Sequence, residues 1–352
     1  MKQDEISIAG RRVGAGHPVY VIAEAGVNHN GDESLARALV SAAARAGADA
    51  VKFQTWVTDK LIAPDAPLAE YQDRNTAGRE SQYEMLRRLE LSYDAFRRVR
   101  EFGAASACLV FSTPDEEDSA DFLAGLGVPV FKIGSAEVTN TGFLAHVARK
   151  GRPVILSTGM ATLGEVERAV RTIEEAGNDQ LVLLHCVSNY PCEPAECNLR
   201  AMDTMRDAFG YPVGFSDHSL GSTMAIAAVA RGACVIEKHL TLDTRMPGPD
   251  HAASLDPDQF AAMVEAIRHT EAALGSGRKE PTPSEVAHRP LMRKRWVACW
   301  PLAAGARIAR EDLALRRATP DGFDPSEIDL LIGRELSQPV PAWGAITRKI
   351  LR

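Results

Sequence analysis

Two histidines that follow apolar runs are the side chains of this sequence best suited to bind a metal ion. His218 lies in the segment GFSDHSLG (214–221), after the apolar run 211–215. His239 follows the apolar residues 233–236. An apolar run that ends in polar residues predicts a buried strand with polar groups at its carboxyl end. Neutral imidazole binds divalent cations, and a strand end fixes its position. Alternatively, each histidine caps its strand or pairs with a nearby carboxylate.

Lysines and hydroxyl side chains near the ends of other apolar runs indicate a site for an anion. Lysine supplies charge and hydroxyls supply oriented hydrogen bonds, which together suit a phosphate or a carboxylate. The members of this set are Lys52, Lys132, Thr113, Ser135, Ser157 and Ser216. Two alternatives remain open: a lysine pairs with Glu237 or Glu137 in a buried salt bridge, or it forms a Schiff base as in aldolases. The histidine pair argues against the Schiff base, because a lysine aldolase needs no metal.

Glu24 and Glu137 are the carboxylates best placed for proton transfer. Each lies just beyond an apolar run. A carboxylate in such a position can act as a general base or orient a water molecule. The alternative for each is that it serves only as an ion-pair partner.

The elements that must position these side chains are eight apolar runs, each followed by a helical pattern. The runs are 19–23, 48–53, 108–111, 128–133, 154–156, 181–184, 211–215 and 233–236. Continuous apolar strands are buried on both faces, as in parallel sheets. Eight strand–helix units predict an α/β fold, a (β/α)₈ TIM barrel with its active site at the carboxyl ends of the strands. An open doubly wound sheet is the alternative, but it would gather its polar strand ends at one crevice.

A change in composition after residue 274 divides the chain. Residues 1–274 hold the eight units and form the predicted catalytic barrel. Residues 275–290 are rich in Gly, Ser, Pro and charge, which is typical of a linker, and residues 291–352 are predicted to form a small satellite domain. Within the barrel, the long polar segment 55–81 is predicted to cover the substrate.

Composition excludes several classes of protein. The chain has 352 residues, of which 45% are hydrophobic, and its net charge of −7 gives no general attraction to nucleic acid or anionic membranes. No apolar run approaches the length of a membrane span, and the N-terminus lacks the pattern of a signal peptide. Six cysteines lack paired metal spacing, and the three in apolar runs, Cys108, Cys186 and Cys234, indicate reduced core thiols of a cytoplasmic protein. Cys192 and Cys197 share a polar loop, where a structural role is favoured over metal binding.

Nine motifs in order give the chain a resemblance to a known family over nearly its whole length. They are IAEAGVNHNGD (22–32), DAVKFQT (49–55), ESQYEMLRRLELS (80–92), FSTP (111–114), FKIGSAE (131–137), ILSTGMATLGE (155–165), LLHCVSNYP (183–191), GFSDHSLG (214–221) and IEKHLTLDTRMPGPDH (236–251). With these motifs the chain resembles the sialic acid synthase family, the nonulosonate synthases that use phosphoenolpyruvate.

The resemblance implies a condensation of phosphoenolpyruvate with the open-chain aldehyde of an acetamido sugar. The enol C3 attacks the aldehyde, water adds at C2, and phosphate leaves by C–O cleavage. The segments MPGPDH (246–251) and AEYQ (69–72) favour the N-acetylneuraminate and N,N'-diacetyllegionaminate synthases over the pseudaminate synthases. We expect N-acetylmannosamine or a related acetamido sugar as the acceptor, with N,N'-diacetyllegionaminate synthesis as the alternative.

The resemblance also implies roles for individual residues. His218 and His239 would hold a divalent metal, Mn²⁺ or Mg²⁺, that polarises the aldehyde oxygen, and Glu137 would position or deprotonate the attacking water. Phosphoenolpyruvate would be held by Lys52, Thr113, Lys132, Ser135, Ser157, Ser188 and Ser216. The sugar would be held by Glu24, Gln54, Asn75, Tyr190 and Asp250, with Glu24 also handling a proton.

The small C-terminal domain is similar to the antifreeze-like (SAF) domain that closes these enzymes. In the family this domain reaches across the two-fold axis of a domain-swapped homodimer and inserts an arginine into the partner's site. The corresponding residue here is Arg317. The family's Arg-Pro-Gly-x-Gly loop is replaced by Arg-Ala-Thr-Pro-Asp-Gly in residues 317–322, so Arg316 remains an alternative.

Two other functions fit parts of the sequence. A phosphoenolpyruvate aldol enzyme that takes a phosphorylated sugar would need additional basic residues, and the loops hold no dense arginine cluster beyond Arg74, Arg79, Arg87 and Arg88. A carbohydrate-binding scaffold in coat or capsule assembly would use the barrel without catalysis. The intact set of polar strand ends argues against such a scaffold.

Overall fold

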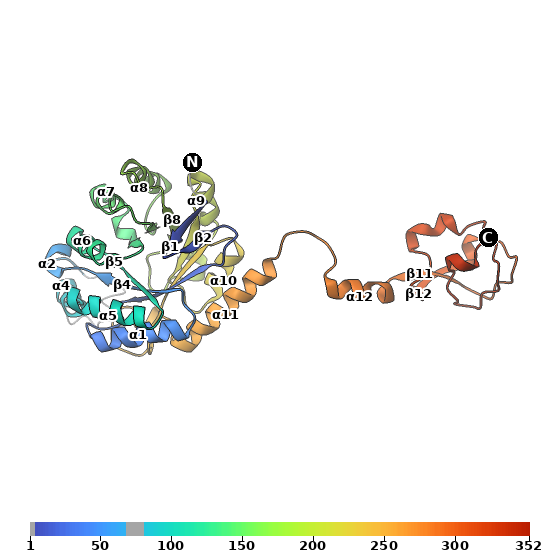
Figure 1. The fold of residues 1–352 in the computed structure, drawn as a ribbon, viewed down its shortest axis with the longest axis horizontal. Helices are drawn as coiled ribbons and strands as arrows, with labels where there is room; N and C mark the ends of the chain where they lie inside the picture. The colour runs from blue at the N-terminus through green and yellow to red at the C-terminus, as the bar shows by residue number, and fades with distance from the viewer. Residues whose placement is uncertain (1–3, 68–80) are drawn as a thin grey trace. The chain divides into compact units, whose positions relative to one another are not determined.

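The computed structural model describes residues 4–67 and 81–352. The chain forms two compact units, Met1–Gly275 and Ser276–Arg352 (Figure 1). Residues 68–80, which belong to the segment expected to cover the substrate, lie outside the described residues, and so does the expected sugar ligand Asn75.

The first unit is built around one eight-stranded sheet. Hydrogen bonds join its strands in the order β5-β4-β3-β10-β9-β8-β7-β6, and β5 and β6 at the two ends contact each other. The strands are β3 (Tyr20–Gly26), β4 (Ala50–Thr55), β5 (Leu109–Pro114), β6 (Phe131–Ile133), β7 (Val154–Ser157), β8 (Leu181–Cys186), β9 (Val213–Asp217) and β10 (Val235–His239). All the paired strands are parallel. The sheet is a nearly closed barrel, which confirms the predicted α/β barrel class.

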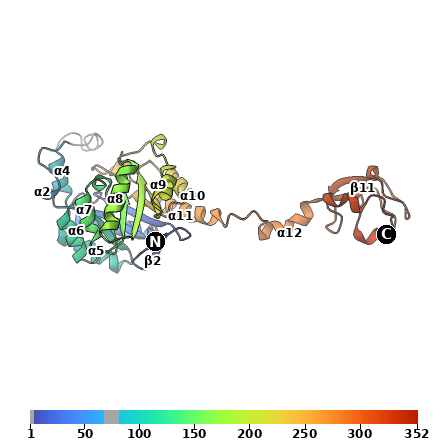
Figure 2. The same cartoon turned by 90° about the horizontal axis from the view of Figure 1, so that it is seen from above.

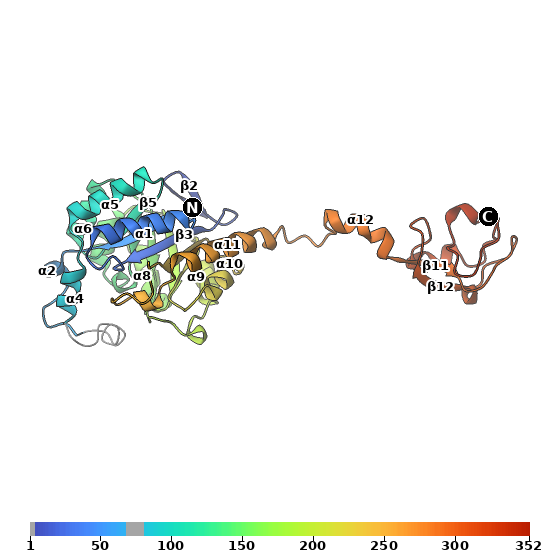
Figure 3. The same ribbon diagram turned by 90° about the horizontal axis from the view of Figure 1, so that it is seen from below.

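Helices surround this barrel. They are α1 (Glu33–Arg45), α2 (Thr58–Leu61), α4 (Gln82–Leu89), α5 (Tyr93–Ala105), α6 (Glu117–Gly125), α7 (Thr141–Ala148), α8 (Leu163–Glu175), α9 (Ala201–Phe209), α10 (Thr223–Ala230) and α11 (Pro257–Leu274). Figure 2 shows α6, α7 and α8 on one side of the barrel, and Figure 3 shows α1, α10 and α11 on its opposite side. Several begin at side-chain caps: Asp32 accepts hydrogen bonds from the first turn of α1, and Thr162 forms a capping box at α8.

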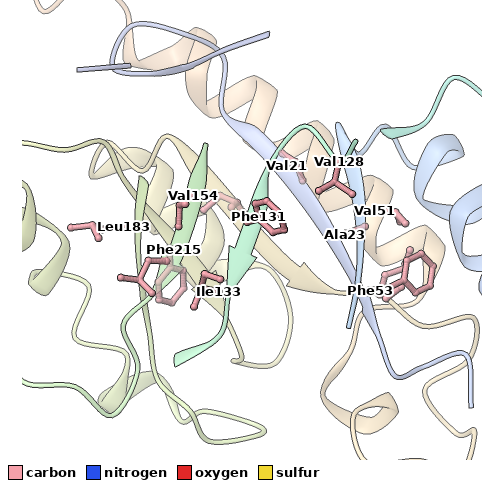
Figure 4. Packing of buried hydrophobic residues seen from close by; sticks show 14 of the residues in the cluster. Val21, Ala23, Val51, Phe53, Val128, Phe131, Ile133, Val154, Leu183 and Phe215 are labelled. Carbon is pink, nitrogen blue, oxygen red and sulfur yellow. The ribbon is translucent and has the colours of Figure 1, made fainter. Parts of the chain in front are cut away.

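Side chains along each strand alternate between the surrounding helices and the barrel interior. In β3, Val21 and Ala23 belong to the large cluster that packs against the helices (Figure 4), whereas Tyr20 and Ile22 belong to a second, interior cluster. Successive side chains of a strand point to opposite faces, so this alternation follows from strand geometry. The hairpin of β1 (Glu5–Ile8) and β2 (Arg11–Gly14) adds apolar side chains to the interior cluster.

The second unit has its own small core. Strands β11 (Lys294–Ala298) and β12 (Leu313–Arg317) pair antiparallel, and Trp296, Ile308 and Leu331 are buried against them. Residues 275–290, expected to be a linker, include most of helix α12 (Pro283–Met292). Thr282 and Glu285 form a capping box that starts this helix, which explains why a Pro-rich segment is helical here. In the described parts of the chain, no helix is long and apolar enough to cross a membrane.

Candidate active site

The side chains that point into the barrel are apolar along most of each strand and polar at its carboxyl end. In β3 the interior position after Ile22 is Glu24, and in β5 the interior position after Phe111 is Thr113. A cavity of about 440 Å³ opens at this end, and residues from every barrel strand or from the turn that follows it line its wall. The predicted site residues in this wall are Glu24, Lys52, Gln54, Thr113, Lys132, Ser135, Ser157, Ser188, Tyr190, Ser216, His218 and His239.

Two buried lysines and two buried glutamates form the floor of this cavity. Lys52 Nζ lies 2.8 Å from Glu24 Oε2 and 3.8 Å from Glu237 Oε2. Lys132 Nζ lies 3.5 Å from Glu237 Oε1, so Glu237 stands between the lysines. The alternative of a buried salt bridge is therefore correct for Glu237. Both lysines pair with this carboxylate, and both also line the cavity.

Hydroxyl groups complete the ring around the lysines. Lys52 donates a hydrogen bond to Thr113 Oγ1 at 3.0 Å, and Lys132 donates one to Ser157 Oγ at 2.6 Å. Ser216 donates to Glu237 Oε1 at 2.9 Å. These hydrogen bonds fix the ammonium and hydroxyl groups before a ligand arrives, which favours the binding of an anion at this end of the barrel.

The two floor carboxylates have opposite pKa shifts. Burial raises the pKa of Glu24 to about 7, against the opposing effect of Lys52. Burial alone would also raise the pKa of Glu237, but Lys132 and Lys52 hold that pKa below its usual range. Glu237 therefore stays ionised and anchors the lysines, whereas Glu24 can gain or lose a proton near neutral pH.

The two lysines also differ. Burial lowers the pKa of Lys132, and the carboxylate of Glu237 only partly offsets this effect. Burial acts on Lys52 in the same direction, but Glu237 and Glu24 raise the pKa of Lys52 above its usual value. Lys52 is therefore the more firmly charged of the two.

The histidine pair lies in the cavity wall, two residues beyond Ser216 and Glu237 on β9 and β10. The ring centroids of His218 and His239 are 5.5 Å apart, and the ring of Tyr190 lies 4.2 Å from that of His218. Burial lowers the pKa of His218 to about 4, and burial together with His218 holds the pKa of His239 well below its usual range. Both imidazoles are therefore neutral at physiological pH, as metal ligands must be.

Each histidine of this pair has a ring nitrogen without a short hydrogen bond, since His218 Nε2 has only a long contact of 3.4 Å with Ser216 Oγ. His218 Nδ1 donates to the carbonyl oxygen of Val187 at 2.7 Å, so its Nε2 carries the lone pair. His239 Nδ1 is buried and has no hydrogen-bond partner among the described residues, with Asp250 Oδ2 at 3.7 Å. No group of three or more His, Cys, Asp or Glu in residues 4–67 and 81–352 is arranged to hold a metal ion. The donor set fits a divalent metal held by two imidazoles that completes its coordination with substrate or water oxygens.

Four predicted site residues do not line the cavity as the structure describes it. Asp250 lies behind His239, and burial raises its pKa to about 6. Glu137 lies in the short helix η1 (Ser135–Glu137) after β6 and accepts a hydrogen bond from Asn140 at 2.7 Å. Arg317 is exposed at the end of β12 in the second unit, and Asn75 lies outside the described residues.

Sequence reasoning missed several side chains of the cavity wall. Asp115, Cys186 and Gln82 line it, and Glu237, considered only as an ion-pair partner, forms its floor. Three of these follow from the two-residue period: Asp115 comes two positions after Thr113, Cys186 two before Ser188, and Glu237 two before His239. Counting interior positions along each strand would have found them.

Comparison with known proteins identifies the relatives of this chain. The model of the NeuB family matches residues 39–279. The N,N'-diacetyllegionaminic acid synthase of Legionella pneumophila is 47% identical over 333 residues, covering 94% of this chain and 93% of that protein. The protein of the same name from Campylobacter jejuni is 42% identical over 316 residues, covering 89% and 94%. The solved structure of N-acetylneuraminic acid (sialic acid) synthetase from Leptospira borgpetersenii in complex with citrate has 33% identity and a TM-score of 0.72, covering 82% and 96%.

Proposed function

Because the chain belongs to the NeuB family, whose members condense phosphoenolpyruvate with acetamido sugars, we propose that it makes N,N'-diacetyllegionaminate. Its acceptor is 2,4-diacetamido-2,4,6-trideoxymannose. The observation that carries this choice is the 47% identity to a legionaminate synthase over 94% of the chain. The likeness to the N-acetylneuraminic acid synthetase, 33%, makes N-acetylmannosamine the second candidate.

Phosphoenolpyruvate binds at the floor of the cavity. Its phosphate and carboxylate groups meet Lys52 and Lys132, and the hydroxyls of Thr113, Ser135, Ser157 and Ser188 donate hydrogen bonds to them. Ser216, whose hydroxyl proton goes to Glu237, lines the same floor. The ion pairs of both lysines with Glu237, and their hydrogen bonds to Thr113 and Ser157, support this assignment, because they hold the two ammonium groups at one end of the barrel.

His218 and His239 hold the divalent metal, Mn²⁺ or Mg²⁺. With a metal held by these two imidazoles, the site would have a Lewis acid able to polarise the aldehyde oxygen of the sugar. Support comes from the neutral state of both rings and from the unpartnered Nδ1 of His239. Val187 fixes the orientation of the His218 ring through its carbonyl oxygen.

The chain's carboxylates handle protons while the bonds change. C3 of the enol forms a bond to the aldehyde carbon, a water oxygen bonds to C2, and the bond from C2 to the phosphate oxygen breaks. Glu24, with a pKa of about 7, exchanges a proton with the sugar, and Gln54 holds it in place with a hydrogen bond of 3.0 Å. Glu137 orients or deprotonates the water. Tyr190, Asn75 and Asp250 complete the sugar site.

The second unit is an SAF-like domain that closes the site of a partner subunit in a homodimer. Arg317 is the arginine that enters that site. The guanidinium of Arg316 lies 3.8 Å from the ring centre of Trp343, whereas no hydrogen bond, ion pair or ring contact joins the side chain of Arg317 to another described residue. Arg317 is therefore the residue of the pair that is free to bind a ligand outside its own unit.

The test is phosphate release from phosphoenolpyruvate with Mn²⁺, with each acetamido sugar offered in a separate reaction. We expect faster release with the diacetamido-trideoxy sugar. Faster release with N-acetylmannosamine would transfer the assignment to N-acetylneuraminate synthesis. Release only with a phosphorylated sugar would contradict both.

A further inference from the structure

Asp115 is a carboxylate in the cavity wall to which the proposed reaction assigns no role. It follows β5 directly, and its backbone N–H donates to the carbonyl oxygen of Thr55 at 3.1 Å, which extends the pairing of β4 and β5 by one step. Phe111, Thr113 and Asp115 occupy alternate positions and face the barrel interior in turn. The side chain of Asp115 therefore stands one step above Thr113, toward the open end of the cavity.

The carboxylate of Asp115 has no partner in the protein as described. Neither a hydrogen bond nor an ion pair joins it to another residue in 4–67 or 81–352. The nearby lysines are already engaged, Lys52 with Glu24 and Thr113, and Lys132 with Ser157. The two carboxylates of the cavity floor, Glu24 and Glu237, both have such partners, and Asp115 in the wall differs from them in this respect.

An unpartnered carboxylate in a partly enclosed site is energetically unfavourable. Burial raises the pKa of Asp115 to about 7, Glu137 and Glu24 add to this effect, and Lys52 and Lys132 oppose it. A ligand that donates hydrogen bonds would remove the cost of leaving this group unpaired. The position of Asp115 beside the cavity floor means that a substrate of the enzyme can supply those donors.

The charge of Asp115 selects between the two substrates. Phosphoenolpyruvate carries a phosphate and a carboxylate, both of which repel a carboxylate and accept rather than donate hydrogen bonds. The acetamido sugar carries hydroxyl and amide N–H groups, which are donors. Only the sugar matches the ionised form of Asp115.

We propose that Asp115 is a sugar-binding residue whose carboxylate accepts hydrogen bonds from hydroxyl or acetamido N–H groups of the acceptor. This assignment rests on the proposed function. It adds a ligand that follows β5, in the same cavity wall as Gln54 and Gln82, to the sugar contacts already expected.

The test compares Asp115→Ala and Asp115→Asn with Glu117→Gln, near pH 8, where a carboxyl group with a pKa of about 7 is ionised. Glu117 is exposed at the start of α6 and lies outside the cavity wall, so its substitution removes a charge from the same segment without touching the site. We expect the sugar KM to rise about ten-fold or more in Asp115→Ala and less in Asp115→Asn. The KM for phosphoenolpyruvate should stay the same or fall, and Glu117→Gln should change neither.

Two outcomes would overturn the assignment: an unchanged sugar KM in Asp115→Ala, or an equal rise in both KM values. Sugar binding measured by calorimetry without phosphoenolpyruvate separates this inference from the proposed function. If the wild-type protein releases no phosphate, yet Asp115→Ala weakens sugar binding, the proposed reaction fails and the sugar contact stands. If the wild-type protein turns over and Asp115→Ala binds the sugar as tightly as the wild type, only the sugar contact fails.

Discussion

The lower and upper halves of the barrel interior are built by the same strands and contrast sharply in chemistry. Ile22, Phe111 and Val182 fill the lower half with closely packed apolar side chains. Two residues further along β3 and β5, the interior positions are Glu24 and Thr113. Strand geometry alone thus places a layer that stabilises the fold directly beneath a layer of buried charges and hydroxyls. Substitutions in the lower layer should therefore reduce stability, whereas substitutions in the upper layer should reduce activity.

The largest effect is expected from the upper layer, at the histidine pair. His218→Ala removes one of two imidazoles proposed to hold the metal, so metal-dependent turnover should fall by about 10³-fold or more. Thermal unfolding of the variant should resemble that of the wild type, because His218 packs in the cavity wall rather than in an apolar core. Near-normal turnover with added Mn²⁺ would rule out His218 as a ligand.

The lower layer should show the reverse pattern. Phe111 is fully buried in the interior cluster, so Phe111→Ala should lower the free energy of unfolding by about 3–5 kcal/mol through the cavity it leaves. The kcat per folded molecule should change little. Urea unfolding and kinetics on the same preparation measure both quantities. A large loss of kcat with unchanged stability would break the separation between the layers.

A smaller effect is expected from the second unit. Arg317→Ala should raise the sugar KM about ten-fold and leave the KM for phosphoenolpyruvate nearly unchanged, because one charged hydrogen-bond donor to the sugar is lost. Arg316→Ala is the matched control, since the guanidinium of Arg316 stacks on Trp343. If the control raises the sugar KM and Arg317→Ala does not, Arg316 is the residue that contacts the sugar.

The smallest expected effect is on the free energy of unfolding, which the partly buried carboxyl group of Asp115 in the upper layer lowers at high pH. The folded protein holds the pKa of Asp115 at about 7, above the ordinary 3.8, so the folded state binds more protons than the unfolded state between these values. Stability contributed by this group therefore falls as pH rises through that window. Asp115→Asn should gain about 1–2 kcal/mol relative to the wild type near pH 8 and nothing near pH 4. A gain that does not depend on pH would show that ionisation of Asp115 is not its cause.

The sequence predicted the barrel and most of the cavity wall because both depend on local patterns. Apolar runs define the strands, and the polar residues after them define the site, as at Lys52 and Lys132. Asp115 escaped notice because it follows Pro114, beyond the end of the apolar run. The central place of Glu237 could not be predicted either, because its contacts join strands β4, β6 and β9 to β10 through side chains from distant parts of the sequence.

Helix α12 was missed because the glycines and prolines of residues 275–283 are typical of a linker. The capping box that starts the helix is a weaker sequence signal than this composition. The carbonyl of Val187 that orients His218 belongs to the loop after β8, and no spacing in the sequence joins the two. Tertiary pairing of this kind decides which nitrogen of an imidazole is free. Sequence patterns identify the residue types of a site, whereas the protonation states and partners require the fold.

The most direct test of the central claim is a competition experiment. The enzyme, phosphoenolpyruvate and Mn²⁺ are mixed with equal amounts of N-acetylmannosamine and the diacetamido-trideoxy sugar, and the products are identified by mass spectrometry. We predict that N,N'-diacetyllegionaminate predominates. A product mixture dominated by N-acetylneuraminate, or unreacted sugars alongside intact phosphoenolpyruvate, would contradict the proposed function.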